Sequence, residues 1–181
     1  AEKVRNWDYA IAKAFMVSLP SRQASALSES YRALPTTADD ARRYARRVYE
    51  PQPALPDLPP VRTMGLVGDR SADQIDTLTG IDVRKFDFRF DEEAVRHVLA
   101  AHGSAKREEL RGQKAIAPDD FGLLPQILGS PDAIDRSGQS AIGETIVVFR
   151  KRIGGVTYFA AMRVSRRRET IALKTFYARG K

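Results

Sequence analysis

The two histidines of this chain, His97 and His102, lie close together in a segment predicted to form a helix. Asp91 can cap this helix, which should run through Ala101 and end at Gly103. On a helical wheel His102 falls within the apolar arc and His97 at its edge, so at least one imidazole should face the packed side. Near a helix C-terminus a protonated imidazole is favoured, and it could act as an acid or a base. The alternative is a core histidine that only hydrogen-bonds a backbone carbonyl.

The last predicted strand offers a second set of reactive groups. Period-two alternation puts Thr175 and Tyr177 on one face, and Lys174 and Phe176 on the other. The two hydroxyl groups could hydrogen-bond a phosphate, and the tyrosine ring could stack on a nucleobase. The alternative interpretation is that threonine and tyrosine are simply good strand formers.

A tripeptide between these segments could supply side-chain donors. In Arg111-Gly112-Gln113, the glycine permits an unusual backbone turn, while the arginine and the glutamine can donate hydrogen bonds. Taken without its context, such a tripeptide is more often a loop than a site.

Positive charge is concentrated in the C-terminal part of the chain. The formal net charge is +7, yet from Glu144 onward ten Lys and Arg residues stand against only Glu144 and Glu169. This distribution favours a polyanionic partner, such as a nucleic acid or an acidic protein, over a surface that is merely solubilising.

Composition excludes several other kinds of chemistry. With no cysteine in the chain, disulfides, thiolate zinc sites and cysteine nucleophiles are ruled out. The two histidines have no carboxylates at a recognisable ligand spacing, so no metal site and no cofactor is expected. No apolar run approaches the length needed to span a membrane, and the N-terminus has no signal-peptide pattern.

The elements that must position these residues are predicted from periodicity and from turn residues. Residues 1–50 should form a helical N-terminal segment, and 51–60, with five prolines, an extended linker that marks a domain boundary. The remaining elements, within a third region of 61–181, are a strand at 83–90, a short helix opened by Pro118 and ending near Gly129, and a meander at 145–152, 156–164 and 170–177. The predicted fold class is α+β, with a small antiparallel sheet packed by helices.

Four strings in this order resemble the phage branch of the barnase–EndoU–colicin–RelE-like ribonucleases. They are HVLAAHG at 97–103, RGQKAI at 111–116, DDFGLLPQILGSPD at 119–132 and LKTFY at 173–177. Members of this family occur as C-terminal domains of MuF-type phage head proteins and of bacterial polymorphic toxins. The resemblance covers about residues 80–178.

The resemblance implies metal-independent cleavage of RNA, in which the ribose 2′-hydroxyl attacks the adjacent phosphorus and leaves a 2′,3′-cyclic phosphate. It implies that the partners are RNA, for example transfer RNA, and an acidic immunity protein. It also implies an effector that is phage-associated or delivered into the bacterial cytoplasm. The catalytic candidates are His97, His102, Lys174, Thr175 and Tyr177, and the substrate-binding candidates are Arg111, Gln113, Arg150, Lys151 and Arg163.

Two other functions remain open from the sequence. A non-catalytic module could use the same basic face to bind nucleic acid or a protein partner. Alternatively, the chain could have a structural role in a phage particle, with the N-terminal helices as the working part. Replacing both histidines separates an enzyme from a binding module, because only the enzyme would lose turnover.

Overall fold

The computed structural model describes residues 38–50 and 61–180. The helices predicted within residues 1–37 and the proline-rich segment at 51–60 lie outside the described residues. The described helices are α4 (Ala38–Tyr49), α5 (Asp69–Thr79), α6 (Glu92–His102), α7 (Ala105–Leu110), the 3₁₀ helix η1 (Pro118–Leu123) and α8 (Leu124–Gly129). The strands are β1 (Val61–Leu66), β2 (Asp87–Asp91), β3 (Ala133–Gln139), β4 (Thr145–Ile153), β5 (Val156–Ser165) and β6 (Thr170–Arg179).

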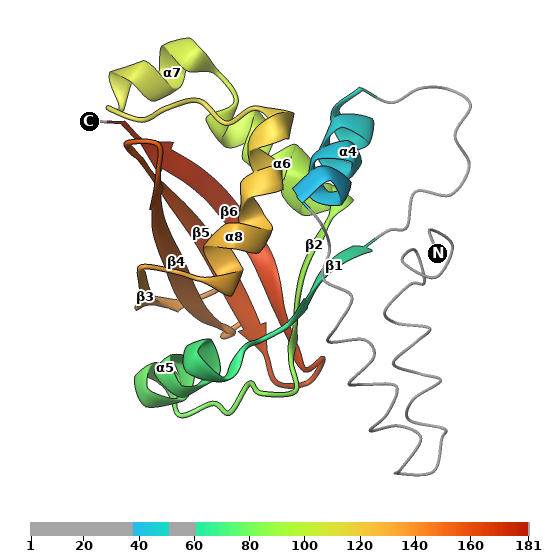
Figure 1. Cartoon of the computed structure of the whole chain (residues 1–181), viewed down its shortest axis with the longest axis vertical. Helices are drawn as coiled ribbons and strands as arrows, with labels where there is room; N and C mark the ends of the chain where they lie inside the picture. The colour runs from blue at the N-terminus through green and yellow to red at the C-terminus, as the bar shows by residue number, and fades with distance from the viewer. Residues whose placement is uncertain (1–37, 51–60, 181) are drawn as a thin grey trace.

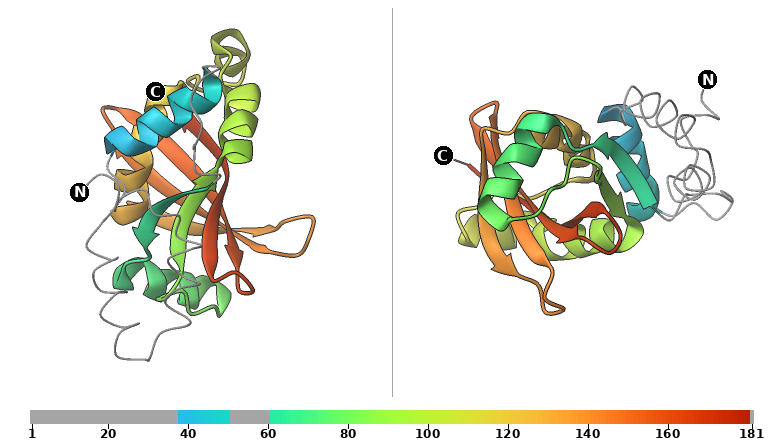
Figure 2. Two further views of the ribbon diagram at one scale, coloured as in Figure 1. Left: turned by 90° about the vertical axis from the view of Figure 1, so that its right-hand side faces the viewer. Right: turned by 90° about the horizontal axis from the view of Figure 1, so that it is seen from below.

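One six-stranded sheet organises the fold, with the strand order β1-β2-β6-β5-β4-β3. All neighbouring strands are antiparallel except β2 and β6, which run parallel. The predicted α+β class and the C-terminal meander are confirmed, although the sheet is larger than expected. Strands β1 and β3 were not predicted from the sequence, because neither has a sharp alternation of apolar residues. Figures 1 and 2 show the meander in orange to red, with α8 lying against it.

The meander forms because its strands alternate cleanly and its first turn is made of glycine. In β5, Tyr158, Ala160, Met162 and Val164 are buried, whereas Phe159 and Arg163 are partly exposed. Gly154 and Gly155 both have positive φ, +57° and +83°, as a tight hairpin between β4 and β5 requires.

Aromatic side chains join the helices to the inner face of the sheet. Phe121 of η1 lies with its ring centroid 5.9 Å from that of Phe90 and 5.8 Å from that of Phe176. Phe88 and Phe149 meet edge to face at 5.4 Å. All five rings are buried, so strands from both halves of the sheet share one hydrophobic core with η1.

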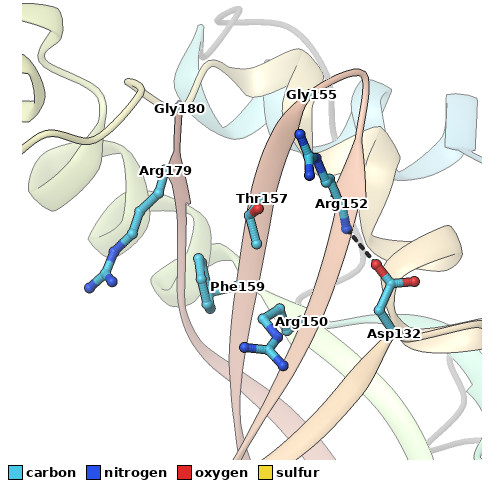
Figure 3. A pocket seen from close by; sticks show the side chains of 8 residues that line it. All are labelled: Asp132, Arg150, Arg152, Gly155, Thr157, Phe159, Arg179 and Gly180. Atoms are coloured by element: carbon cyan, nitrogen blue, oxygen red, sulfur yellow. Dashed lines mark hydrogen bonds between the residues drawn. The ribbon is translucent and has the colours of Figure 1, made fainter.

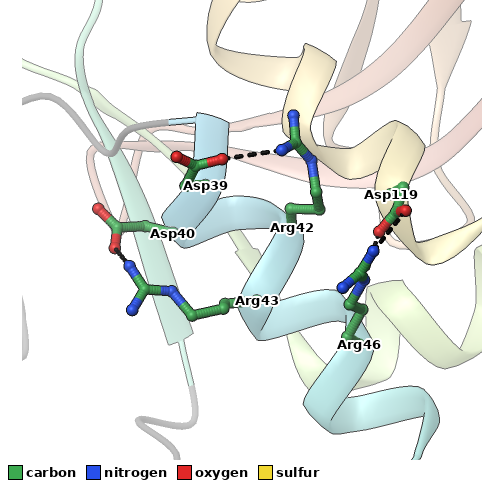
Figure 4. A network of polar contacts seen from close by, with 6 residues as sticks. All are labelled: Asp39, Asp40, Arg42, Arg43, Arg46 and Asp119. Carbon is green, nitrogen blue, oxygen red and sulfur yellow. Dashed lines mark hydrogen bonds and ion pairs between the residues drawn. The ribbon is translucent and has the colours of Figure 1, made fainter.

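Helix α4 belongs to this same core. Its buried face carries Tyr44, whose ring packs edge to face on Phe90 at 5.2 Å. On its outer side, Arg46 makes a paired hydrogen bond to Asp119 of η1, from Nε to Oδ1 at 2.5 Å and from Nη2 to Oδ2 at 2.6 Å (Figure 4). From the sequence, residues 38–50 were expected to belong to the N-terminal segment. In the structure, α4 packs on elements that follow position 60, among them η1 and α6.

Two predicted elements have different bounds in the structure. The strand expected at 83–90 is β2, at Asp87–Asp91, because a turn closed by the hydrogen bond from Phe86 N to Val83 O precedes it. The helix expected from Pro118 to Gly129 is divided into η1 and α8 at Leu124. Pro125 lacks the backbone N–H that a continuous α-helix would need at this position. This missing donor accounts for the division.

We expect the Arg46–Asp119 pair to make stability depend on acidity. Hydrogen bonds from Arg46 lower the pKa of Asp119 below its ordinary value. The pair therefore stabilises the fold above the unfolded-state pKa of this carboxyl, and that contribution is lost as the pH falls through the lower folded-state pKa. Asp119→Asn should give a slightly lower urea midpoint than the wild type at pH 7, because exposed ion pairs contribute little, and the same midpoint in strongly acidic buffer. Equal urea midpoints for wild type and Asp119→Asn at both pH values would contradict this expectation. The control is Asp135→Asn, which changes an exposed residue of β3.

Candidate functional site

A buried carboxylate holds His102 in place at the end of α6. The Nδ1 atom of His102 lies 3.0 Å from Oε2 of Glu108, and Nη1 of Arg111 donates to Oε1 of the same carboxylate at 2.8 Å. The Glu108 side chain is fully buried, whereas 16% of the His102 side chain is exposed. Because a carboxylate only accepts hydrogen bonds, it favours the tautomer of His102 with the proton on Nδ1 rather than on Nε2.

Local sequence sets the turn that brings Glu108 back to His102. Asp91 caps α6 by accepting from Ala94 N at 2.8 Å, and Ser104 caps α7. Gly103 ends α6, as predicted, but in a right-handed backbone conformation. A Cβ atom there would lie 2.4 Å from the Leu99 carbonyl oxygen, so close approach makes glycine necessary at this position.

His102 lies against the sheet, beside Tyr177 of β6. The centroids of the two rings are 5.8 Å apart, and their planes are inclined by 33°. The loop after α7 joins the same two elements, because Ile116 N donates to the His102 carbonyl at 2.8 Å and Lys114 N donates to the Ala178 carbonyl at 2.9 Å. The predicted packing of an imidazole toward the sheet is therefore confirmed for His102.

His97 lies elsewhere on α6. Five residues turn an α-helix by about 140° beyond one full revolution, so His97 and His102 occupy different sides. His97 is exposed, so it lies off the buried side of α6.

The face of the sheet opposite the core gathers most of the other predicted residues; we call it the outer face. Across it, Phe159 is paired with both Arg150 and Tyr177, so these three residues form one row. In the next row Ala161 is paired with Thr175, which places Thr175 and Tyr177 on the same face as predicted.

A bulge changes the expected position of Lys174. The β5–β6 register steps from Ala161–Thr175 to Met162–Leu173, which leaves Lys174 as an extra residue without a partner in the register. Lys174 is exposed and Phe176 is fully buried, so the prediction that they share one face is wrong.

Lys151 points away from the row of Arg150, to the other side of β4. Its Nζ donates to the Ser130 carbonyl and lies 3.4 Å from Oδ1 of Asp132. Arg163 does belong to the outer face, paired with Ala172 of β6. The structure thus brings together His102, Thr175, Tyr177, Arg111, Arg150 and Arg163 on or beside this face.

Three buried polar atoms near these elements have no hydrogen-bond partner within the described part of the chain. They are the Thr175 hydroxyl, Nε of Arg163 and Oε1 of Gln113. Buried polar groups are nearly always satisfied, so orphaned ones are places where a bound group can donate or accept. Gln113 follows Gly112, whose φ of +65° confirms the unusual turn predicted for the loop.

Four residues of this region were not predicted from the sequence: Glu108, Phe159, Arg152 and Arg179. Phe159 stacks on Tyr177 with a centroid separation of 4.8 Å and an interplanar angle of 6°, and Arg179 lies 5.5 Å from the Phe159 ring. Period-two alternation from Tyr177 could have located Arg179, but nothing in the sequence shows that Glu108 folds back onto His102.

Lys114 is a cation of the core side rather than of the outer face. Burial acts to lower its pKa, but hydrogen bonds to the Tyr158 hydroxyl and to Asp120, each 3.0 Å long, hold the pKa above its ordinary value. Lys114 therefore stays protonated and is unsuited to act as a general base.

The geometry defines a basic, partly aromatic surface with one oriented imidazole, which is an arrangement typical of proteins that bind and process nucleic acids. The family model described as phage-Barnase-EndoU-ColicinE5/D-RelE like nuclease3 matches residues 65–181, and the chain belongs to this family of nucleases. No curated protein and no solved structure matches the chain. Among the helices of the described ranges, none is long and apolar enough to cross a membrane.

Proposed function

We propose that this protein is an endoribonuclease that cleaves RNA without a metal ion, by attack of the ribose 2′-hydroxyl on the adjacent phosphorus. The observation that carries the proposal is the His102–Glu108 pair, an imidazole oriented by a buried carboxylate beside a cationic face. Membership of a nuclease family supports nucleic acid as the substrate. The requirement for a 2′-hydroxyl makes RNA the substrate class.

In this proposal His102 removes the proton from the 2′-hydroxyl through Nε2. The 2′-oxygen forms a bond to phosphorus, the bond from phosphorus to the 5′-oxygen breaks, and the products are a 2′,3′-cyclic phosphate and a 5′-hydroxyl. The departing 5′-oxygen needs a proton, and the candidate donor is the hydroxyl of Tyr177, whose ring lies 5.8 Å from that of His102. Thr175, whose hydroxyl is orphaned, would donate to a phosphate oxygen.

An arginine of the outer face would balance the charge that develops on the phosphorus centre. Arg163 lies in the row next to that of Thr175 and would serve this role, because a guanidinium group binds phosphate oxygens in a fixed geometry. Arg150 lies in the same row as Tyr177 and would bind a neighbouring part of the RNA. Arg111 already binds Glu108, so we assign it a positioning role through that carboxylate. His97, Lys174 and Lys151 have no role in this proposal.

The partners proposed from the resemblance are an RNA, for example a transfer RNA, and an acidic immunity protein that would cover the outer face. Charge complementarity supports the second partner, because acidic side chains would pair with the arginines of that face. As a phage-associated or delivered effector, the protein would act in the bacterial cytoplasm.

The test is incubation of the purified protein with total RNA in excess EDTA, followed by analysis of the fragment ends. Fragments that end in 2′,3′-cyclic phosphate are expected. RNA that stays intact but is bound in a salt-sensitive way would refute the enzyme and indicate a binding module instead.

Tyr177→Phe provides a specific check of the assignment on β6. Removing the hydroxyl while keeping the ring should lower the cleavage rate on the order of 10²-fold, the lower end of the effect of general acid catalysis. Affinity for RNA should remain close to that of the wild type. Tyr49→Phe, which removes an exposed hydroxyl on α4, is the matched control. Full activity in Tyr177→Phe would remove Tyr177 from the proposed chemistry.

A further inference from the structure

A shallow hollow lies on the outer face, close to the turn that joins β4 to β5. Residues of β4, β5 and β6 line it. Its volume is about 410 Å³, and Figure 3 shows the side chains that surround it. The side chains that matter for binding are Arg150, Arg152, Arg179, Phe159, Thr157 and Asp132. None of the residues assigned above to proton transfer lines it.

Three guanidinium groups give the hollow its positive charge. Asp132 is the acidic residue in its lining, and the backbone N–H of Arg152 donates to its Oδ2 at 2.8 Å. The second oxygen of Asp132 lies 3.4 Å from Nζ of Lys151, so a cation outside the hollow partly offsets this negative charge. The lining therefore remains cationic and suits an anionic group such as a phosphate diester.

Aromatic rings connect the hollow to the His102 site. Phe159 lines the hollow and stacks on Tyr177, which in turn lies against His102. Arg179 lies 5.5 Å from the centroid of Phe159 and 6.0 Å from that of Tyr177. Nucleobases stack on aromatic rings and on guanidinium planes whatever the base, so this row can accommodate single-stranded nucleic acid.

We propose that this hollow is a binding site for one further nucleotide of a single-stranded RNA, adjoining the nucleotides at the cleaved bond. Its base stacks on Phe159, and its phosphate is bound by Arg150, Arg152 and Arg179. The position relative to the cleaved bond rests on the proposed function, whereas binding of single-stranded nucleic acid by the hollow does not. Substrates longer than a dinucleotide should therefore bind more tightly than a dinucleotide.

The experiment measures affinity with RNA oligonucleotides whose 2′-hydroxyls are all methylated, because these cannot be cleaved by 2′-oxygen attack. Dissociation constants are determined by fluorescence anisotropy for a dinucleotide and a tetranucleotide. The wild type should bind the tetranucleotide on the order of tenfold more tightly, as expected for one stacked base with a charged phosphate contact. The double variant Arg150→Gln/Arg152→Gln should lose most of this gain.

A matched control separates the hollow from a general effect of charge. Arg136→Gln/Arg167→Gln also removes two positive charges, but from exposed residues that line a different hollow. That hollow lies beside Thr145, at the other end of β4. This variant should keep the gain with length. Phe159→Leu should lose it and Phe159→Tyr should keep it, which tests stacking separately from charge.

Each outcome decides one of the two proposals. If the control variant loses the gain as fully as the hollow variant, or the wild type shows no gain or no binding, the further nucleotide site is wrong even if RNA is cleaved. If the gain depends on Arg150, Arg152 and Phe159 while the wild type fails to cleave RNA, the site stands and the proposed nuclease mechanism is wrong.

Discussion

Replacing His102 by alanine should lower the rate of RNA cleavage by about 10²- to 10⁴-fold, the range that general acid–base catalysis contributes. The reason is that His102 carries the imidazole that the structure orients by a buried carboxylate and places against Tyr177. The measurement is single-turnover cleavage of a labelled RNA, with the enzyme in excess so that binding does not limit the rate.

His97→Ala is the matched control, because it removes the other imidazole from an exposed position on the same helix. Its cleavage rate should stay within about twofold of the wild type, as surface substitutions away from a site have small effects. Loss of activity in His97→Ala with retention in His102→Ala would reverse the assignment. Equal RNA affinity in all three proteins would show that the His102 effect lies in the chemical step.

Glu108→Gln should have the second large effect, on both stability and catalysis. Glu108 is fully buried but its partner Arg111 is half exposed. Losing the carboxylate charge should therefore cost about 2 kcal/mol, as for a hydrogen bond to a charged group, and lower Tm by about 6 °C. The amide can also donate to Nδ1 of His102 and so favour the tautomer that blocks Nε2. Loss of the correct tautomer can reduce kcat by up to about 10⁴-fold.

Glu109→Gln is the matched control for Glu108→Gln, because it makes the same change at the neighbouring exposed residue of α7. To separate positioning from unfolding, kcat and KM should be measured well below the Tm of Glu108→Gln. A fall in kcat with little change in KM is expected for a positioning residue. If kcat is unchanged at that temperature, Glu108 only stabilises the fold and has no part in orienting His102.

The sequence predicted those elements whose own pattern is strong. The meander has alternating residues and a Gly154–Gly155 turn, and α6 has both an aspartate cap and a terminal glycine, so local interactions define their bounds. Strand β2 begins later than expected because the residues from Val83 to Phe86 form a hydrogen-bonded turn. Phe86 is nevertheless buried. Side-chain alternation alone cannot distinguish such a turn from a strand.

The candidate site was predicted only in part, for reasons of topology. Thr175 and Tyr177 could be placed together because they lie on one strand, and period-two alternation relates them directly. Glu108 reaches His102 only because Gly103 permits a tight turn between two helices, and no periodicity shows this. Lys174 was misplaced by a bulge, which shifts alternation by one residue and which depends on the partner strand.

The position of β6 in the sheet has a consequence for how the protein folds. Although it is sixth in sequence, β6 lies third in the sheet, between β2 and β5, and its parallel pairing joins residues as distant as Asp87 and Thr170. Without β6, the β1–β2 ladder and the β3–β5 ladder would share no hydrogen-bonded edge. Contacts of such long sequence separation make folding slow. The strand that carries Thr175 and Tyr177 also joins the two parts of the sheet. Before β6 is in place, the chain therefore has neither a complete core nor a complete site. The proposed activity would then require that β6 has already joined both parts of the sheet.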